Sequence, residues 1–151
     1  MENKFNIFLE IAKKLNECKI EPILYGSLGL YRLIGELDTI HDIDIIIPNE
    51  NLIDKFEELK NAMAELGYRQ DMRYPHEFTK GDGQIGFEPE SDLKELGISS
   101  GEIKTVTVGG IKFRELTKEN FLVVYRSYKK VYQGKMRSID LKIEKLEEIN
   151  I

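Results

Sequence analysis

Residues 24–48 of this 151-residue chain have the sequence LYGSLGLYRLIGELDTIHDIDIIIP, and their pattern carries most of the information about the fold. The apolar run 23–25 predicts a short strand. Residues 27–35 have helical periodicity. Residues 41–48 are rich in β-branched side chains and stop at a proline, which predicts the strongest strand of the chain. The stretch therefore predicts a strand, a helix and a second strand in succession.

Two aspartates stand near the start of the second predicted strand. Asp42 and Asp44 are two positions apart, so their side chains point to one face of the sheet, while Ile43 and Ile45 point to the other. Two carboxylates on one buried face repel each other and lose solvation. A divalent cation relieves both costs, and Mg²⁺ usually binds one or two carboxylates together with substrate phosphates. The pair indicates a Mg²⁺ or Mn²⁺ site; a solvated strand end has the same spacing.

Gly26 and Ser27 stand at the junction between the first strand and the helix. A glycine there lets the backbone approach a ligand closely. The start of a helix presents free N–H groups and a positive dipole end to an anion, and Ser27 adds a hydroxyl donor. An ordinary turn in which Ser27 caps the helix and Gly35 ends it has the same sequence. With the aspartates on the next strand, the junction predicts a site for a metal-bound nucleoside triphosphate.

This segment resembles the signature of the DNA polymerase beta-like nucleotidyltransferase superfamily. That signature is an apolar residue, Gly-Ser or Gly-Gly, a spacer, and Asp-x-Asp flanked by apolar residues; here the spacer is slightly long. The chain is similar to small stand-alone bacterial members, such as lincosamide nucleotidyltransferases and the nucleotidyltransferase-like proteins of toxin–antitoxin loci. The resemblance covers about residues 5–148. It is fairly specific in the quoted segment and rests on the order of elements elsewhere.

The resemblance implies a mechanism for these positions. Asp42 and Asp44 would hold one or two Mg²⁺ (or Mn²⁺) ions, and Gly26 and Ser27 would bind the β- and γ-phosphates of an NTP such as ATP. An acceptor hydroxyl would attack the α-phosphorus and release pyrophosphate. The acceptor would be a small molecule such as an antibiotic, an RNA or a protein. Lys130, on a later predicted helix, is a candidate phosphate contact, although a solvated helix face explains it equally.

The sequence departs from the family pattern at the third carboxylate. Active members carry a further Asp or Glu on a later strand, and the matching position here is Gly86. Glu88 lies two residues on and faces the same side, so it is the first candidate for this catalytic and metal-binding acid. Glu77 on the partner strand is the second candidate, and absence of a third acid is the remaining alternative. His76 is a further candidate for a substrate contact.

The rest of the pattern predicts a single domain over 1–151 of class α+β, with a nucleotidyltransferase-type core. A small mixed sheet is flanked by helices and followed by a C-terminal helical pair. The predicted elements outside the quoted stretch are a helix over 3–18, a helix over 49–66, a strand over 68–73, a hairpin of 76–80 with 84–88, a hairpin of 103–108 with 111–114, a helix from 117, and a helix over 136–149.

Composition restricts the class of protein. The net charge of −5 argues against general DNA binding, although residues 112–142 carry nine Lys and Arg against three acids. The chain has one cysteine and no apolar run long enough to span a membrane, so we expect a cytoplasmic protein without disulfides. The short length leaves little room for an acceptor domain, and a homodimer could complete the cleft.

Two functions of different class follow. The first is a metal-dependent nucleotidyltransferase. The second is a catalytically degenerate relative that binds a nucleotide or a partner protein without turnover, and Gly86 at the position of the expected acid favours it. A plain structural module with a solvated Asp-Ile-Asp segment is a third reading.

Overall fold

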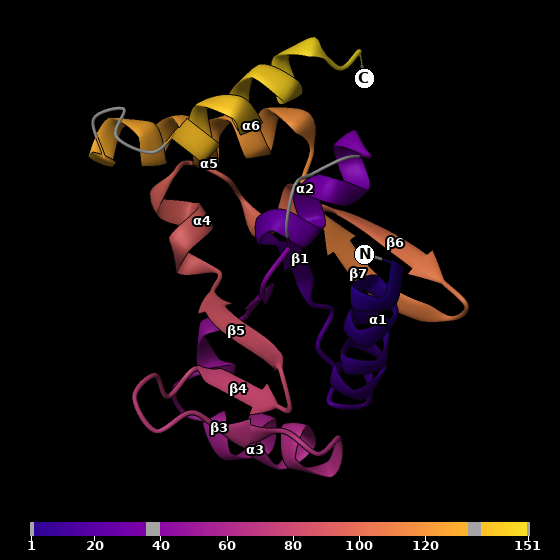
Figure 1. The fold of residues 1–151 in the computed structure, drawn as a ribbon. Helices are drawn as coiled ribbons and strands as arrows, with labels where there is room; N and C mark the ends of the chain where they lie inside the picture. The colour runs from indigo at the N-terminus through magenta and orange to yellow at the C-terminus, as the bar shows by residue number, and fades with distance from the viewer. Residues whose placement is uncertain (1, 36–39, 133–136, 151) are drawn as a thin grey trace.

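The computed structural model describes residues 2–35, 40–132 and 137–150. These form one seven-stranded sheet with helices on both faces (Figure 1). The strands are β1 (Ile23–Tyr25), β2 (Ile43–Ile47), β3 (Arg69–Gln70), β4 (Glu77–Lys80), β5 (Gly83–Pro89), β6 (Lys104–Val108) and β7 (Ile111–Glu115). The helices are α1 (Glu2–Glu17), α2 (Gly26–Ile34), α3 (Phe56–Glu65), α4 (Ser91–Glu95), α5 (Lys118–Tyr132) and α6 (Arg137–Glu148), with 3₁₀ turns η1 (Asn49–Asn51) and η2 (Ser100–Glu102).

The sheet is mixed, with the strand order β3-β4-β5-β2-β1-β7-β6. The pairs β2–β5 and β1–β7 are parallel, and the remaining neighbours are antiparallel. The α+β class, the strand–helix–strand start, both hairpins and the C-terminal helical pair are thus confirmed. Figure 1 shows α5 and α6 side by side at one end of the molecule and α3 with the β3–β4 edge at the other.

The two faces of the sheet pack into separate apolar clusters. Ile43, Ile45 and Ile47 point toward α1 and α3. Their cluster includes Phe8 of α1 and Phe113 of β7, which are both fully buried. Ile46 points to the other face and packs with residues of α4, α5 and α6. Because side chains alternate along a strand, Asp44 shares the face of Ile46. The carboxylate therefore lies on the side of the sheet that the C-terminal helices cover.

Some boundaries differ from those predicted. The helix predicted over 49–66 is interrupted: η1 comes first, and α3 begins only at Phe56. The strand predicted over 68–73 keeps only two residues, and α4 and η2 are too short to show periodicity in a sequence. Ser27 does not cap α2, because the helix starts at Gly26 and has no side-chain cap. Gly35 ends α2 as predicted, in the left-handed conformation with φ of 84°.

Among the described helices, none combines the length and the apolar character needed to cross a membrane.

Candidate active site

One row of residues crosses the middle of the sheet. Tyr25 on β1 pairs with Asp44 on β2, Asp44 pairs with Gly86 on β5, and Gly86 pairs with Glu77 on β4. Paired residues on neighbouring strands lie beside one another on one face of a sheet. The register therefore places the carboxylates of Asp44 and Glu77, the Tyr25 ring and the empty position at Gly86 on one face of the sheet. The C-terminal helices cover this face.

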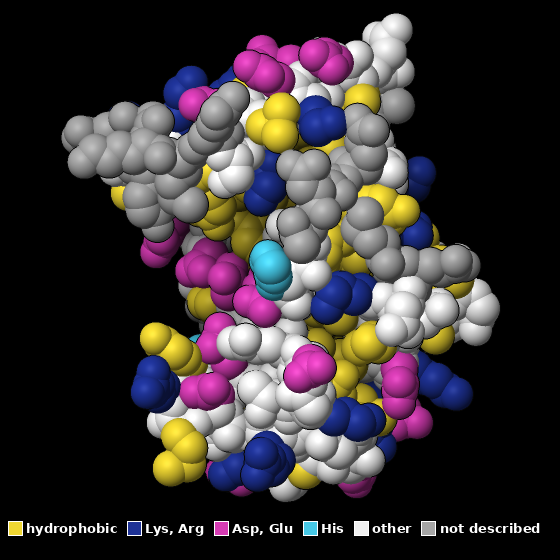
Figure 2. Space-filling model, viewed as in Figure 1, with side chains coloured by type: hydrophobic (Ala, Val, Ile, Leu, Met, Phe, Trp, Pro, Cys, Tyr) yellow, Lys and Arg dark blue, Asp and Glu magenta, His cyan; other side chains and the backbone are white. Residues whose placement is uncertain are grey.

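A cavity of about 360 Å³ lies between this face and the helical pair. The sheet and α2 line one wall, and α5 and α6 line the other. Figure 2 shows acidic side chains gathered at mid-height, below the helical pair and near the end of β5. The lining residues are Tyr25, Gly26, Ser27, Asp44, Glu88, Val124, Tyr125, Tyr128, Ser138, Ile139 and Lys142.

Gly26 and Asp44 fit against each other at the floor of the cavity. Gly26 has a φ of +62°, a conformation that L side chains rarely adopt. A Cβ at Gly26 would lie 2.9 Å from Cγ of Asp44 and would overlap its Oδ2 atom. The absence of a side chain is therefore what lets the carboxylate reach the first turn of α2. This close approach brings the predicted anion-binding junction and the predicted metal ligand together.

Burial and neighbouring charges raise the pKa of both carboxyls that line the cavity. The pKa of Asp44 rises to about 6, first through burial and then through the charges of Asp42 and Glu77, while Lys142 opposes the shift. The pKa of Glu88 rises to about 7, again first through burial and then through the charges of Asp44 and Asp92. The cavity therefore brings together acidic groups whose charged form is disfavoured, and Lys142 offsets this only in part at Asp44.

The donor set suits a hard divalent cation. Carboxylate oxygens are the ligands that Mg²⁺ prefers, and one or two of them suffice when substrate phosphates complete the shell. The Asp44 carboxylate occupies the space that a side chain at Gly26 would fill. Asp42 is half-buried, and its charge raises the pKa of Asp44. Within the ranges that the structure describes, no three acidic, histidine or cysteine side chains already form a metal-binding group. Asp42 and Asp44 thus fit a cation whose coordination shell further ligands would complete.

A cation from α6, Lys142, faces the cavity, and the sequence pattern did not single it out. Its Nζ lies 3.4 Å from Oγ of Ser27 and 5.2 Å from the centre of the Tyr125 ring. Burial lowers the pKa of Lys142, and the charge of Asp44 opposes that shift. Lys130, the predicted phosphate contact, is exposed and is absent from the described lining of the cavity. The structure therefore brings together Gly26, Ser27 and Asp44, but not Lys130.

Aromatic side chains form the wall opposite Asp44. Oη of Tyr25 lies 3.1 Å from Oη of Tyr128, which links the sheet to α5. The rings of Tyr125 and Tyr128 contact each other edge to face, with centroids 5.9 Å apart. Sequence periodicity predicts core positions for the α5 tyrosines, and Tyr125 is indeed buried. What periodicity misses is that these rings also line a ligand-sized cavity.

The remaining candidates lie apart from one another. Glu88 lines the cavity, but it pairs with Ile46, two residues beyond the pairing of Asp44 with Gly86. Glu77 is half-buried on the same face as Asp44. His76 is exposed, and its ring packs 5.7 Å from that of Phe56. His76 thus points toward α3 and away from the carboxylates.

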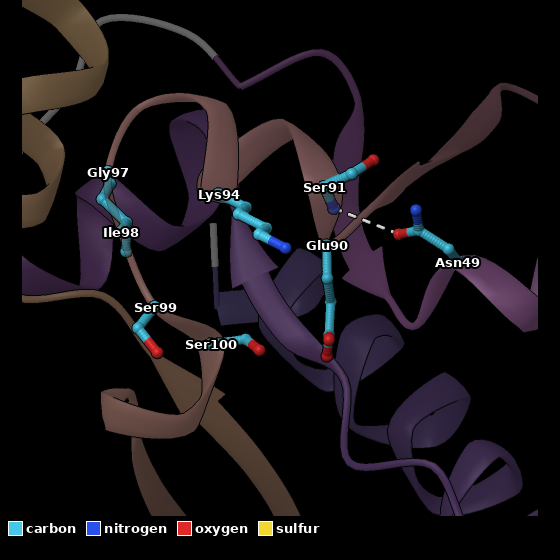
Figure 3. A pocket seen from close by; sticks show the side chains of 8 residues that line it. All are labelled: Asn49, Glu90, Ser91, Lys94, Gly97, Ile98, Ser99 and Ser100. Carbon is cyan, nitrogen blue, oxygen red and sulfur yellow. Dashed lines mark hydrogen bonds between the residues drawn. The ribbon is translucent and has the colours of Figure 1, made fainter.

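A second cavity, of about 560 Å³, lies beside α4 (Figure 3). Some of its lining groups already have partners: Oδ1 of Asn49 accepts a hydrogen bond from the Ser91 N–H, and Glu90 pairs with Arg114 at 2.7 Å. Arg114 also donates to the Ser100 carbonyl at 2.6 Å. These contacts join β7, α4 and η2. The second cavity therefore has the character of a structural seam, unlike the cavity at Asp44.

The raised pKa values predict an unusual dependence of stability on pH. Between about pH 4 and pH 7 the folded protein binds more protons at Asp44 and Glu88 than the unfolded chain does, so their stabilising contribution is lost as the pH rises through about 6 and 7. Asp44→Asn removes one such group. We expect it to raise the free energy of unfolding near pH 8 by roughly 2–3 kcal/mol and to have little effect near pH 4.

Urea unfolding in EDTA at both pH values measures this difference. Asp82→Asn, at an exposed turn between β4 and β5, is the matched control and should change neither value. Equal stability of Asp44→Asn and the natural protein near pH 8 would show that Asp44 is not destabilised by its surroundings.

The comparison with known sequences gives one relative. No model of a known protein family matches the chain. YnaI, an uncharacterized protein of Bacillus subtilis strain 168, is 37% identical over 124 residues, which cover 81% of this chain and 80% of YnaI.

The comparison with solved structures identifies the fold. The antibiotic-resistance factor ANT(2'')-Ia has a TM-score of 0.65 at 16% identity, and the match covers 96% of this chain and 83% of that one. The lincosamide antibiotic adenylyltransferase LnuA, with lincomycin bound, has a TM-score of 0.64 at 17% identity, and the match covers 99% and 98%. A nucleotidyltransferase-like protein from Paracoccidioides brasiliensis has a TM-score of 0.63 at 14% identity, with 94% and 72% covered. The resemblance found in residues 24–48 is thus confirmed for the fold.

Proposed function

The chain belongs to the family of Bacillus subtilis YnaI and has the nucleotidyltransferase fold, and from this premise we propose that it is a metal-dependent nucleotidyltransferase. It would move a nucleoside monophosphate from an NTP to a hydroxyl group of an acceptor. The observation that carries the proposal is the fit of Asp44 against Gly26, beside Ser27 and Lys142, in one cavity.

The phosphates of the NTP would bind where α2 begins. Backbone N–H groups of its first turn and the Ser27 hydroxyl supply donors, and the helix dipole favours negative charge there. Lys142 adds a positive charge from the opposite wall, since its Nζ is 3.4 Å from the Ser27 hydroxyl oxygen. The two walls of the cavity would therefore hold the triphosphate between them.

Asp42 and Asp44 would hold the Mg²⁺ or Mn²⁺ ion. When bound, such an ion neutralises charge that develops on the phosphate oxygens as the acceptor oxygen replaces pyrophosphate at the α-phosphorus. The acceptor hydroxyl must lose its proton. Glu88 lines the same cavity, and its pKa of about 7 suits a general base that works near neutral pH. The aromatic wall would shield the reacting atoms from water on that side.

Lys142→Gln tests the phosphate contact against the one predicted from sequence. We expect it to weaken binding of Mg²⁺–ATP by about 10- to 100-fold, since a hydrogen bond to a charged group contributes about 1.5–3 kcal/mol. Calorimetric titration measures the affinity. Lys130→Gln, on the exposed face of α5, is the matched control and should bind within about twofold of the natural protein. A large loss of affinity in Lys130→Gln and little change in Lys142→Gln would instead assign the phosphate contact to Lys130.

Titration of ATP, CTP, GTP and UTP in the presence of Mg²⁺ tests the function itself. The proposal expects binding of at least one NTP that requires Mg²⁺ and is lost in Asp42→Asn/Asp44→Asn. A screen of hydroxyl acceptors, followed by pyrophosphate release, then identifies the second substrate. Absence of Mg²⁺-dependent binding by the folded protein to all four nucleotides would refute the proposal.

A second candidate function rests on Gly86. Because the described residues hold no preformed group of three metal ligands, the fold could retain a nucleotide without transferring it. Mg²⁺-dependent NTP binding without pyrophosphate release to any acceptor would favour this alternative.

A further inference from the structure

Gly86 leaves a gap in the row of residues that crosses the sheet beside Asp44. The gap is buried, and a Cβ built at Gly86 would lie 3.3 Å from Oδ1 of Asp44 and 3.9 Å from Oε1 of Glu77. Two carboxylates from different strands thus border the same small space. That space is the one that an Asp or Glu at position 86 would fill. A side chain from a neighbouring strand can therefore enter the space that position 86 leaves empty.

We propose that Glu77, which reaches over Gly86 from β4, supplies the third carboxylate of the metal site. This inference rests on the proposed nucleotidyltransferase function. Glu77 stands directly opposite Gly86 in the β4–β5 ladder, and Gly86 stands directly opposite Asp44 in the β5–β2 ladder. With strands about 4.8 Å apart, the longer side chain of a glutamate spans the intervening strand where an aspartate would fall short.

The register also explains why Glu88 is the poorer candidate. Asp42 precedes Asp44, and because β2 and β5 run parallel, the residue beside Asp42 on β5 is two positions before Gly86. Glu88 is two positions after Gly86 and pairs with Ile46. Asp42 and Glu88 are thus on opposite sides of the Asp44 row, about 13 Å apart along the strand direction. An ion bound between Asp42 and Asp44 would therefore lie on the side of Asp44 away from Glu88, and the Glu88 carboxylate would be poorly placed to bind it.

Glu77 and Gly86 therefore form a matched pair. A carboxylate moved from the central strand to its neighbour needs an empty position in between, and Gly86 provides it. On this proposal the third acid lies on β4 instead of β5, in the same row as Gly86 and Asp44. On this proposal, Gly86 accommodates the acid instead of marking its loss, and Asp42, Asp44 and Glu77, which do not form a metal-binding group as they stand, would close around the ion.

Binding of Mn²⁺, followed by electron paramagnetic resonance in the presence of ATP, tests this assignment without requiring an acceptor. We expect Glu77→Gln to weaken Mn²⁺ binding by about tenfold or more, because loss of even an outer partner of a metal ligand costs about 10- to 100-fold. Glu88→Gln should change it by less than about threefold. The double variant Glu77→Gln/Gly86→Asp returns a carboxylate to the central strand and should recover most of the affinity. The circular dichroism of each variant checks that it is folded.

The possible results separate this inference from the function on which it rests. Mn²⁺ binding that Asp44→Asn abolishes but Glu77→Gln leaves unchanged would overturn the assignment of Glu77 alone. Loss in Glu88→Gln instead would give the third position to Glu88 and overturn it as well. Failure of the natural protein to bind Mn²⁺ with ATP would overturn both proposals. Loss in Glu77→Gln with recovery in the double variant would support the inference, because general damage to the fold would not be repaired by a second substitution.

Discussion

Asp44→Asn is expected to lower the rate of nucleotidyl transfer by about a thousandfold or more. The substitution keeps the size of the side chain and its fit against Gly26, but it removes the negative charge that would hold the metal at the triphosphate. A bound metal ion contributes several kcal/mol of charge stabilisation in such reactions, and about 4 kcal/mol corresponds to a thousandfold in rate. The loss should therefore appear in catalysis even where the protein is folded.

Pyrophosphate release measures the rate, and calorimetry of Mg²⁺–ATP gives a readout that needs no acceptor. Asp82→Asn is the control, because it makes the same chemical change at an exposed turn. The expected gain in stability of Asp44→Asn near pH 8 makes the experiment sharper, since lost activity cannot then be ascribed to unfolding. Retention of more than a tenth of the rate would remove Asp44 from the catalytic machinery.

Gly26→Ala is expected to abolish Mg²⁺-dependent nucleotide binding through geometry alone. The added Cβ would occupy the space of the Asp44 carboxylate, and the backbone would have to hold an alanine at φ of +62°. The left-handed conformation costs a non-glycine residue about 1–2 kcal/mol, and displacement of Asp44 adds to that cost. We therefore expect a fall in stability of about 2–3 kcal/mol together with loss of binding.

Gly35→Ala at the other end of α2 separates the two causes. Gly35 has φ of +84°, and nothing lies within 4 Å of a Cβ built there. This variant should share the backbone cost of about 1–2 kcal/mol and keep nucleotide binding. Urea unfolding and calorimetry on both variants measure the two quantities. Equal binding by Gly26→Ala and Gly35→Ala would show that the contact between Gly26 and Asp44 has no part in the site.

The local part of the candidate site could be predicted from the sequence. The two-residue spacing places Asp42 and Asp44 on one face, and the structure puts Asp44 in the cavity with Gly26 and Ser27. The boundaries of most strands and helices that were strongly periodic or ended at glycine or proline were also close, although α3 begins only at Phe56 and not at residue 49. Short elements such as α4 were missed because five residues contain too little pattern to distinguish a helix from a turn.

The opposite wall of the cavity depends on how the last two helices dock. Lys142 lies on α6 between Ile139 and Ile143, which face the core, so its place beside an apolar stripe was a signal that could have been used. Lys130 was predicted as a phosphate contact from its place in a basic stretch, which does not indicate the direction of its side chain. Periodicity distinguishes an inner from an outer face, but the element that the inner face meets is set by tertiary packing.

The pairing of Glu77 with Gly86 was within reach of the sequence. The hairpin turn at residues 81–83 was predicted, and once Lys80 pairs with Gly83 the antiparallel ladder places Glu77 opposite Gly86. The parallel pairing of β5 with β2 could not be predicted in the same way, because no turn links these strands and their register comes from packing. That second pairing is what brings Glu77 toward Asp44.

The contacts that close the cavity join parts of the chain that are made at very different times. Tyr25 and Tyr128 are 103 residues apart, and Ser27 and Lys142 are 115 apart. At about 5–20 residues per second, a ribosome adds Lys142 roughly ten seconds after Ser27. During that interval the growing chain carries its acidic strand without the lysine that faces it. Under the proposed function, nucleotide capture would be a property of the finished fold, and a ribosome-bound chain that lacks α6 should not sequester cellular NTPs.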